Sequence, residues 1–211
     1  MTLSSSTCEI YFVRHGETEW NFQDRIQGHT DIPLNATGIA QAIELSELLA
    51  NISFSAAYSS DLSRAHLTAE LVLKSRELPV MASTALRERS AGALEGVNKQ
   101  IFEEQIRPFL SSKQALHHET YIKTAWHPEI ETVHSVFNRV TDFLFPLAKQ
   151  YGNKSLLVVS HGGVLRSILD HIAFTPGVRW IVDNCGFIKL KIHQQKIELI
   201  DCHRVFNKPA L

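Results

Sequence analysis

The sequence predicts an α/β layered fold built around a mostly parallel β-sheet. Short apolar runs alternate along the chain with segments whose apolar residues recur at helical spacing, as in strands joined by crossover helices. The run SLLVVS at 155–160 is continuously apolar in its centre, as expected for a strand buried on both faces. The length of 211 residues and the absence of repeats favour a single domain over 1–211.

The first half of the chain alternates predicted strands with predicted helices. The strands cover 8–13, 54–60 and 78–83, and the helices cover 37–50 and 61–75. Asn35 or Thr37 caps the first helix, and Ser60 or Asp61 caps the second. Helical spacing places a set of apolar residues on one inward face of each helix: Ile39, Ala42, Leu45 and Leu49, then Leu62, Ala65, Ala69 and Val72.

The second half begins with the clearest helical pattern, over 132–151. Gly152 ends this helix, and Pro146 is expected to kink or shorten it. A strand at 155–160, a helix at 163–173 and a final hairpin of two strands, 186–192 and 196–202, complete the pattern. Residues 97–131 break the alternation, and we interpret them as an insertion over the functional site.

Composition and charge narrow the possible functions. Hydrophobic residues make up 44% of the chain and charged residues 20%, which is typical of a globular protein. A formal net charge of −1 argues against general binding to nucleic acid or to an anionic membrane. No signal peptide and no run long enough to span a membrane are recognised. We therefore expect a cytoplasmic protein, and its oligomeric state is left open.

Cysteine and histidine spacing predicts neither a disulfide framework nor a metal site. The three cysteines are scattered and form no CxxC pair: Cys8, Cys185 and Cys202. His117, His118 and His127 do not follow a ligand spacing, and we expect them to be solvated loop residues. The sequence therefore predicts no metal.

Two strands end in a histidine followed by glycine. Arg14, His15 and Gly16 follow the first strand, and His161 with two glycines follows the strand at 155–160. Glycine lets the backbone approach a ligand closely, and the helix that starts after His161 offers free N–H groups to an anion. An α/β sheet places its ligands beyond the carboxyl ends of its strands, so both histidines belong at the predicted site.

Arg64 and Glu88 also come shortly after predicted strands. Arg64 lies in the first helical turn, where a cation opposes the helix dipole, so an external anion is the better explanation for it. Each signal is weak alone, because a first-turn arginine is usually a surface residue and a glutamate between arginines is usually an ion-pair partner. Together, two histidines, two arginines and one carboxylate suit phosphoryl transfer.

Each of these residue types has a role in that chemistry. Arginine stays charged and donates in bidentate geometry to phosphoryl oxygens. Neutral imidazole is a good nucleophile near pH 7 and later a good leaving group, and neighbouring arginines favour its neutral form. A protonated carboxyl group can donate to the leaving oxygen.

Five segments, in this order, resemble the histidine phosphatase superfamily, also called phosphoglycerate-mutase-like: RHGETEWN, PLNATGIAQA, SSDLSRAHLTAE, LRERSAGALEG and VVSHGG. The resemblance covers most of the chain. It implies a three-layer α/β sandwich with a six-stranded, mostly parallel sheet and helices on both faces. It also implies a small phosphorylated substrate and no metal or organic cofactor.

The resemblance further implies a role for individual residues. His15 would carry the phosphoryl group, His161 would stabilise its charge, Arg14 and Arg64 would bind its oxygens, and Glu88 would be the general acid. Other positions match the phosphate pocket or the substrate lysine of the family: Thr18, Asn21, Gln27, Gly162 and Lys99.

Two departures favour a phosphatase over a phosphoglycerate mutase dependent on 2,3-bisphosphoglycerate, which is the alternative. Ala91 stands where mutases have an aromatic residue, and the insertion has Arg107, with Lys113 and Lys123 apart, in place of an adjacent arginine pair. Lys99 is the one mutase-like feature. A non-catalytic binding protein is disfavoured, since none of the five catalytic positions is lost.

Overall fold

A computed structural model describes residues 7–112 and 117–209 of the chain. Lys113 therefore lies outside the described residues. The strands, in chain order, are β1 (Cys8–Arg14), β2 (Phe54–Ser60), β3 (Val80–Ser83), β4 (Ser155–Ser160), β5 (Val178–His193) and β6 (Lys196–Pro209). The helices are α1 (Glu19–Phe22), α2 (Ala36–Leu48), α3 (Ser63–Val72), α4 (Lys99–Ser112), α5 (His118–Lys123), α6 (Val133–Gln150) and α7 (Gly162–Ile172), with the short 3₁₀ turns η1 (Thr84–Leu86) and η2 (Gly92–Leu94).

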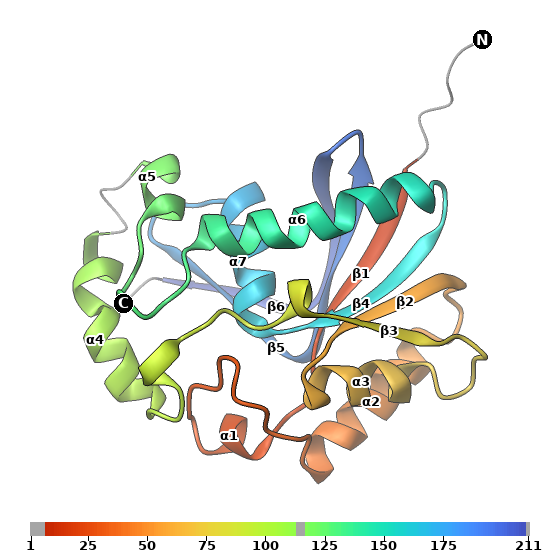
Figure 1. The fold of residues 1–211 in the computed structure, drawn as a ribbon, viewed down its shortest axis with the longest axis horizontal. Helices are drawn as coiled ribbons and strands as arrows, with labels where there is room; N and C mark the ends of the chain where they lie inside the picture. Colours follow the sequence, from red (N-terminus) through yellow and green to blue (C-terminus); the bar gives the residue numbers. More distant parts are fainter. Residues whose placement is uncertain (1–6, 113–116, 210–211) are drawn as a thin grey trace.

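The strands form one six-stranded sheet in the order β3-β2-β4-β1-β5-β6. Strands β1 to β4 pair in parallel, and β5 pairs antiparallel with both β1 and β6. The predicted α/β fold with a mostly parallel sheet is confirmed. Figure 1 shows α6 and α7 on one face of the sheet and α2 and α3 on the other.

Strand β1 illustrates how the sheet makes two cores. Its side chains alternate, so Ile10 and Phe12 pack under α6 and α7, while Tyr11 and Val13 pack under α2 and α3. All four are buried because both faces of a central parallel strand are covered.

Among the described helices, none is long and apolar enough to cross a membrane.

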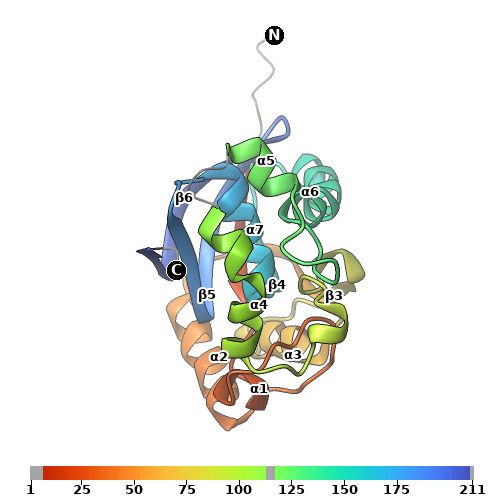
Figure 2. The same ribbon diagram turned by 90° about the vertical axis from the view of Figure 1, so that its left-hand side faces the viewer.

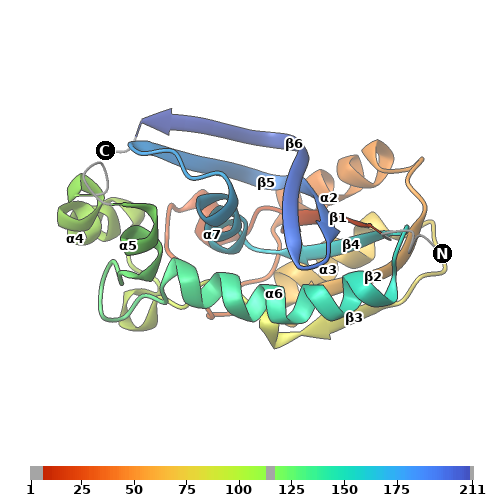
Figure 3. The same ribbon diagram turned by 90° about the horizontal axis from the view of Figure 1, so that it is seen from above.

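Strand β1 lies beside β4 with Arg14 paired to Ser160. This register brings the carboxyl ends of the two strands, and the histidine that follows each, to one point. Figures 2 and 3 show α4 and α5 at the same end of the molecule, with the long β5–β6 hairpin reaching toward them.

Several local predictions need correction. Asn35 does cap α2, but neither Ser60 nor Asp61 caps α3, which starts after Leu62 without a side-chain cap. Ile39 was expected to face inward but is 38% exposed.

Helix α6 is not shortened by its proline. It continues through Pro146 to Gln150, since an apolar face that stays buried on both sides of the proline outweighs the lost hydrogen bond. Strands β5 and β6 are longer than predicted, because an irregularity between Val182 and Phe187 hides the strand period there.

Candidate active site

The two predicted histidines meet at the ends of β1 and β4. Their ring centroids are 5.2 Å apart, and the rings are inclined by 63°. The His15 backbone N–H donates to the Ser160 carbonyl at 2.9 Å, which ties the two turns together. Both histidines are almost completely buried, His15 at 2% exposure and His161 at 0%.

Hydrogen bonds assign opposite tautomers to the two rings. The Nδ1 of His15 lies 2.6 Å from the Gly16 carbonyl oxygen, which can only accept, so Nδ1 carries the proton and Nε2 the lone pair. The Nδ1 of His161 accepts from Nε of Arg64 at 3.3 Å, so its proton is on Nε2. That Nε2 is buried without a partner in the described parts of the chain. One ring therefore offers a nucleophile and the other a hydrogen-bond donor.

Both rings are held neutral. Burial lowers the pKa of His15 and of His161 well below 6.5, and the Arg64 guanidinium lowers each pKa further. A neutral His15 is a competent nucleophile at pH 7.

Arg64 is fully buried behind the two rings. Besides its contact with His161, it donates to the carbonyl oxygens of Thr30, at 2.7 Å, and Gly28, at 2.8 Å. Asp31 forms a long ion pair with it at 4.0 Å. Helix α3 thus places the Arg64 guanidinium against His161. Three of the N–H groups of this guanidinium already donate to protein acceptors.

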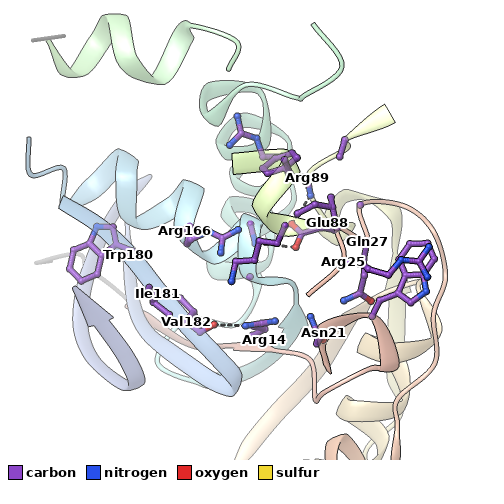
Figure 4. Close-up of a pocket in the computed structure, with 18 of the residues that line it drawn as sticks. Arg14, Asn21, Arg25, Gln27, Glu88, Arg89, Arg166, Trp180, Ile181 and Val182 are labelled. Atoms are coloured by element: carbon purple, nitrogen blue, oxygen red, sulfur yellow. Dashed lines mark hydrogen bonds between the residues drawn. The ribbon is translucent and has the colours of Figure 1, made fainter. Parts of the chain in front are cut away.

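Arg14 faces the cavity that begins beside His15 (Figure 4). Its Nη1 donates to the Val182 carbonyl at 2.6 Å, while its Nε is buried without a partner among the described atoms. Burial, with a contribution from the neighbouring Arg166, lowers the pKa of Arg14 to about 10. This side chain retains donor capacity for an anion in the cavity.

The side chain of Glu88 lies at the amino terminus of α7. Its Oε1 accepts from the Arg89 backbone N–H at 2.7 Å, and its Oε2 accepts from the Gly163 N–H at 3.0 Å. A Cβ atom on Gly163 would lie 2.4 Å from Oε1, so the second glycine of the motif makes room for the carboxylate. The carboxylate therefore faces the cavity in one defined position.

Thr18, Asn21 and Gln27 form a small polar network at the start of α1. The Thr18 hydroxyl lies 3.0 Å from Oε1 of Gln27, and the Oδ1 of Asn21 accepts from the Thr18 N–H at 3.2 Å. Since the oxygens of both amides are engaged, their NH₂ groups are left to face the cavity that both residues line. Figure 4 shows Asn21 close to Arg14.

The cavity has a volume of about 350 Å³, which suits a small organic phosphate. Residues of the predicted insertion contribute to its wall: Lys99, Phe102, Tyr121, Trp126 and Ile130. Lys99 is at the rim, half exposed, with its Nζ 3.7 Å from Oδ1 of Asp24.

Some cavity residues were not predicted from the sequence: Arg89, Arg166, Arg179, Trp180 and Asn184. Arg166 has no hydrogen-bond or ion-pair partner in the described part of the chain. It lies four residues after Gly162, on the same face of α7, and this spacing is a signal that could have revealed it. Nothing in the sequence pattern indicates the residues of β5.

Comparison with known proteins is consistent with this geometry. Residues 10–203 match the family model of the histidine phosphatase superfamily, branch 1. The chain is 34% identical to the uncharacterized phosphatase PhoE of Bacillus subtilis over 78% of its length and 77% of that protein. It is 33% identical to the adenosylcobalamin/alpha-ribazole phosphatase of Escherichia coli over 96% of its length and 97% of that protein. The crystal structure of a phosphoglycerate mutase from Bacillus anthracis superposes with a TM-score of 0.74, at 26% identity, covering 93% of this chain and 92% of that one.

Proposed function

Because this chain belongs to the histidine phosphatase superfamily, branch 1, we propose that it hydrolyses phosphomonoesters through a phosphohistidine formed on His15. Phosphorylated small molecules are typical substrates of this family. The observation that carries the proposal is the pair of opposite tautomers, which sets the Nε2 lone pair of His15 beside the Nε2–H of His161.

In the first step, Nε2 of His15 attacks phosphorus and the bond from phosphorus to the ester oxygen breaks. Glu88 gives its proton to that oxygen, and the alcohol leaves. The His161 Nε2–H and Arg14 donate to the non-bridging oxygens, whose charge grows in the transition state. Arg166, which lines the same cavity, is a further donor to this group.

In the second step, water attacks phosphorus and the bond to Nε2 of His15 breaks. The Glu88 carboxylate, now deprotonated, accepts a proton from the water, and inorganic phosphate is released. The NH₂ groups of Asn21 and Gln27 hold the phosphoryl group in both steps. Arg64 acts through His161, whose tautomer it sets, in addition to adding positive charge.

The insertion at 97–131 is proposed to select the organic part of the substrate within one domain over 1–211. Phe102, Tyr121 and Trp126 line the cavity and add aromatic surface to a wall that also carries the arginines of the phosphoryl site. The substrate is therefore expected to carry an organic group that contacts these rings.

The mutase alternative has one observation in its favour, since Lys99 lines the cavity at the position that matches the mutase lysine. A mutase would return the phosphoryl group of His15 to a second hydroxyl, whereas the phosphatase passes it to water. Conversion of 3-phosphoglycerate that depends on added 2,3-bisphosphoglycerate would favour the mutase.

The test is a screen of sugar phosphates, phosphoglycerates, nucleotides and phosphopeptides for phosphate release, with and without 2,3-bisphosphoglycerate. Rapid acid-free quenching and mass spectrometry should find one phosphoryl group on His15 during turnover. A His193→Ala variant, which removes a histidine at the β5–β6 turn, is the matched control and should still carry the phosphoryl group on His15. A covalent phosphate on another residue, or none with any active substrate, would refute the mechanism.

A further inference from the structure

Strand β5 changes course where it passes the end of β1. Its pairing with β1 reaches Phe187, and its pairing with β6 is irregular between Val182 and Phe187. Within this interval the buried Cys185 has a φ of 54°, in the left-handed region that residues with a side chain rarely adopt. Irregularities of this kind re-aim side chains, often next to active sites.

The side chain re-aimed here is that of Asn184, which contacts two residues of the active site. Its Nδ2 donates to the His15 carbonyl oxygen at 3.0 Å and to Oδ1 of Asn21 at 3.3 Å. The Cys185 backbone N–H donates to the same His15 carbonyl at 3.3 Å. A single amide from β5 thus links the proposed nucleophile to the phosphoryl pocket.

The contact between Asn184 and Asn21 decides which end of the Asn21 amide faces the cavity. The Asn21 oxygen accepts from Asn184 on one side and from the Thr18 N–H on the other, so the Asn21 NH₂ is turned toward the ligand. Without Asn184, the Asn21 oxygen is left with Thr18 alone, whose N–H lies at 3.2 Å and whose hydroxyl lies at 3.1 Å, and the His15 carbonyl keeps the Cys185 N–H. The Asn21 amide belongs to a side chain that can rotate, whereas the His15 carbonyl is fixed by its main chain, so loss of Asn184 acts mainly through Asn21.

Asn184 itself is not built to bind the phosphoryl group, although it lines the cavity. Both hydrogens of its NH₂ group are directed at protein acceptors, and its remaining polar atom is an amide oxygen, which does not attract an anion.

We propose that Asn184 is a positioning residue, whose amide orients the Asn21 amide and holds the His15 main chain for phosphoryl transfer. This inference rests on the proposed function, in which Asn21 and His15 contact the phosphoryl group. The reaction would thus depend on a residue of β5, which lies outside the RHG and HGG motifs.

The test is a double-mutant cycle read out by orthovanadate binding in isothermal titration calorimetry, with kcat and KM for p-nitrophenyl phosphate measured in parallel. Asn184→Ala should weaken vanadate binding by about 10- to 100-fold, since a displacement of about 1 Å in a phosphoryl pocket has effects of that order. In an Asn21→Ala background the same change should weaken binding by less than about threefold, because coupled residues are not additive. Asn51→Ala, an amide lost from an exposed turn, should change neither quantity.

A variant that keeps the side-chain shape guards against misfolding. Asn184→Asp replaces the donor by an acceptor that faces two other acceptors, and it should bind vanadate more weakly than Asn184→Ala. The melting temperatures of both variants should fall by no more than about 2–4 °C. Equal losses in the two Asn21 backgrounds, or wild-type affinity in both Asn184 variants, would overturn the inference.

The same data separate this inference from the proposed function. Wild-type protein that binds vanadate but hydrolyses no ester would refute hydrolysis, while Asn184 would still be judged by its vanadate cycle. Wild-type protein that does not bind vanadate would overturn both.

Discussion

Replacing Gly163 by alanine should disable the proposed general acid while leaving the fold intact. The added Cβ would lie 2.4 Å from Oε1 and 3.1 Å from Cδ of Glu88. The clash involves the far end of a flexible side chain, so the carboxylate can move and the backbone need not. Alanine also has a higher helix propensity than glycine by about 1 kcal/mol at an interior helical position, an upper bound for the first turn of α7.

The size of the effect follows from the distance by which the carboxylate must move. Ordinary contact between Cβ and a carboxylate oxygen is at least about 3.4 Å, so Oε1 must retreat by about 1 Å. A displacement of that size in a catalytic group costs about 100-fold in rate. The loss should fall on kcat for alkyl phosphates, whose leaving oxygen needs a proton, and hardly at all on p-nitrophenyl phosphate.

The assay compares kcat for an alkyl phosphate and for p-nitrophenyl phosphate in wild type and Gly163→Ala, together with thermal unfolding. Glu88→Gln should show the same substrate dependence without the added methyl group. Glu88→Asp, which shortens the side chain, should recover part of the rate in the Gly163→Ala background. Equal losses on both esters, or a melting temperature lowered by more than about 4 °C, would refute Glu88 as a mobile acid opposite Gly163.

Four other predictions test the site and the packing behind it. His15→Ala should reduce turnover by about 1,000-fold or more, and a variant that keeps a tenth of the wild-type rate would exclude His15 as nucleophile. Arg64→Lys should lower both the activity and the free energy of unfolding, the latter by about 2–5 kcal/mol in urea denaturation. The compact ammonium lacks the planar fork that reaches three acceptors lying on different sides of the guanidinium. Wild-type stability would contradict this. In NMR titrations the rings of His15 and His161 should titrate well below pH 6.5, because burial and the Arg64 guanidinium lower the pKa of each ring. A midpoint near 6.5 would show that the guanidinium is elsewhere. Burial, with a contribution from neighbouring histidines, lowers the pKa of His171 to about 4. Between pH 6.5 and 4 the unfolded chain therefore binds a proton that the folded chain does not, so the free energy of unfolding should fall as the pH drops through this range. His171→Gln should flatten this slope, and an unchanged slope would contradict the assignment.

Much of this site could be predicted from the sequence, because its main residues occur where strands end. His15 and His161 each follow an apolar run directly, and the rule that parallel strands present their carboxyl ends to one edge brings them together. Their 5.2 Å separation needed one further fact, the pairing of Arg14 with Ser160, which places β1 and β4 side by side. Local pattern does not determine which strands are neighbours.

The burial of Arg64 is a case where the sequence indicated the residue but not its environment. Its place in the first turn of α3 suggested an anion partner. The structure directs three of its five donors at two carbonyl oxygens and at Nδ1 of His161, and a contact with an anion stays a prediction. Those acceptors come from loops 34 to 97 residues away, and no periodicity along α3 encodes them.

The sequence by itself determined the fold class and indicated the candidate site residues, because hydrophobic period and strand ends are local properties of the chain. Only the tertiary structure decided the tautomer of His161, the position of Glu88 against Gly163, and the contact of Asn184 in β5 with His15. Each of these depends on an atom's position relative to a partner distant in the chain. Such positions follow from how strands and helices pack, which local pattern leaves open.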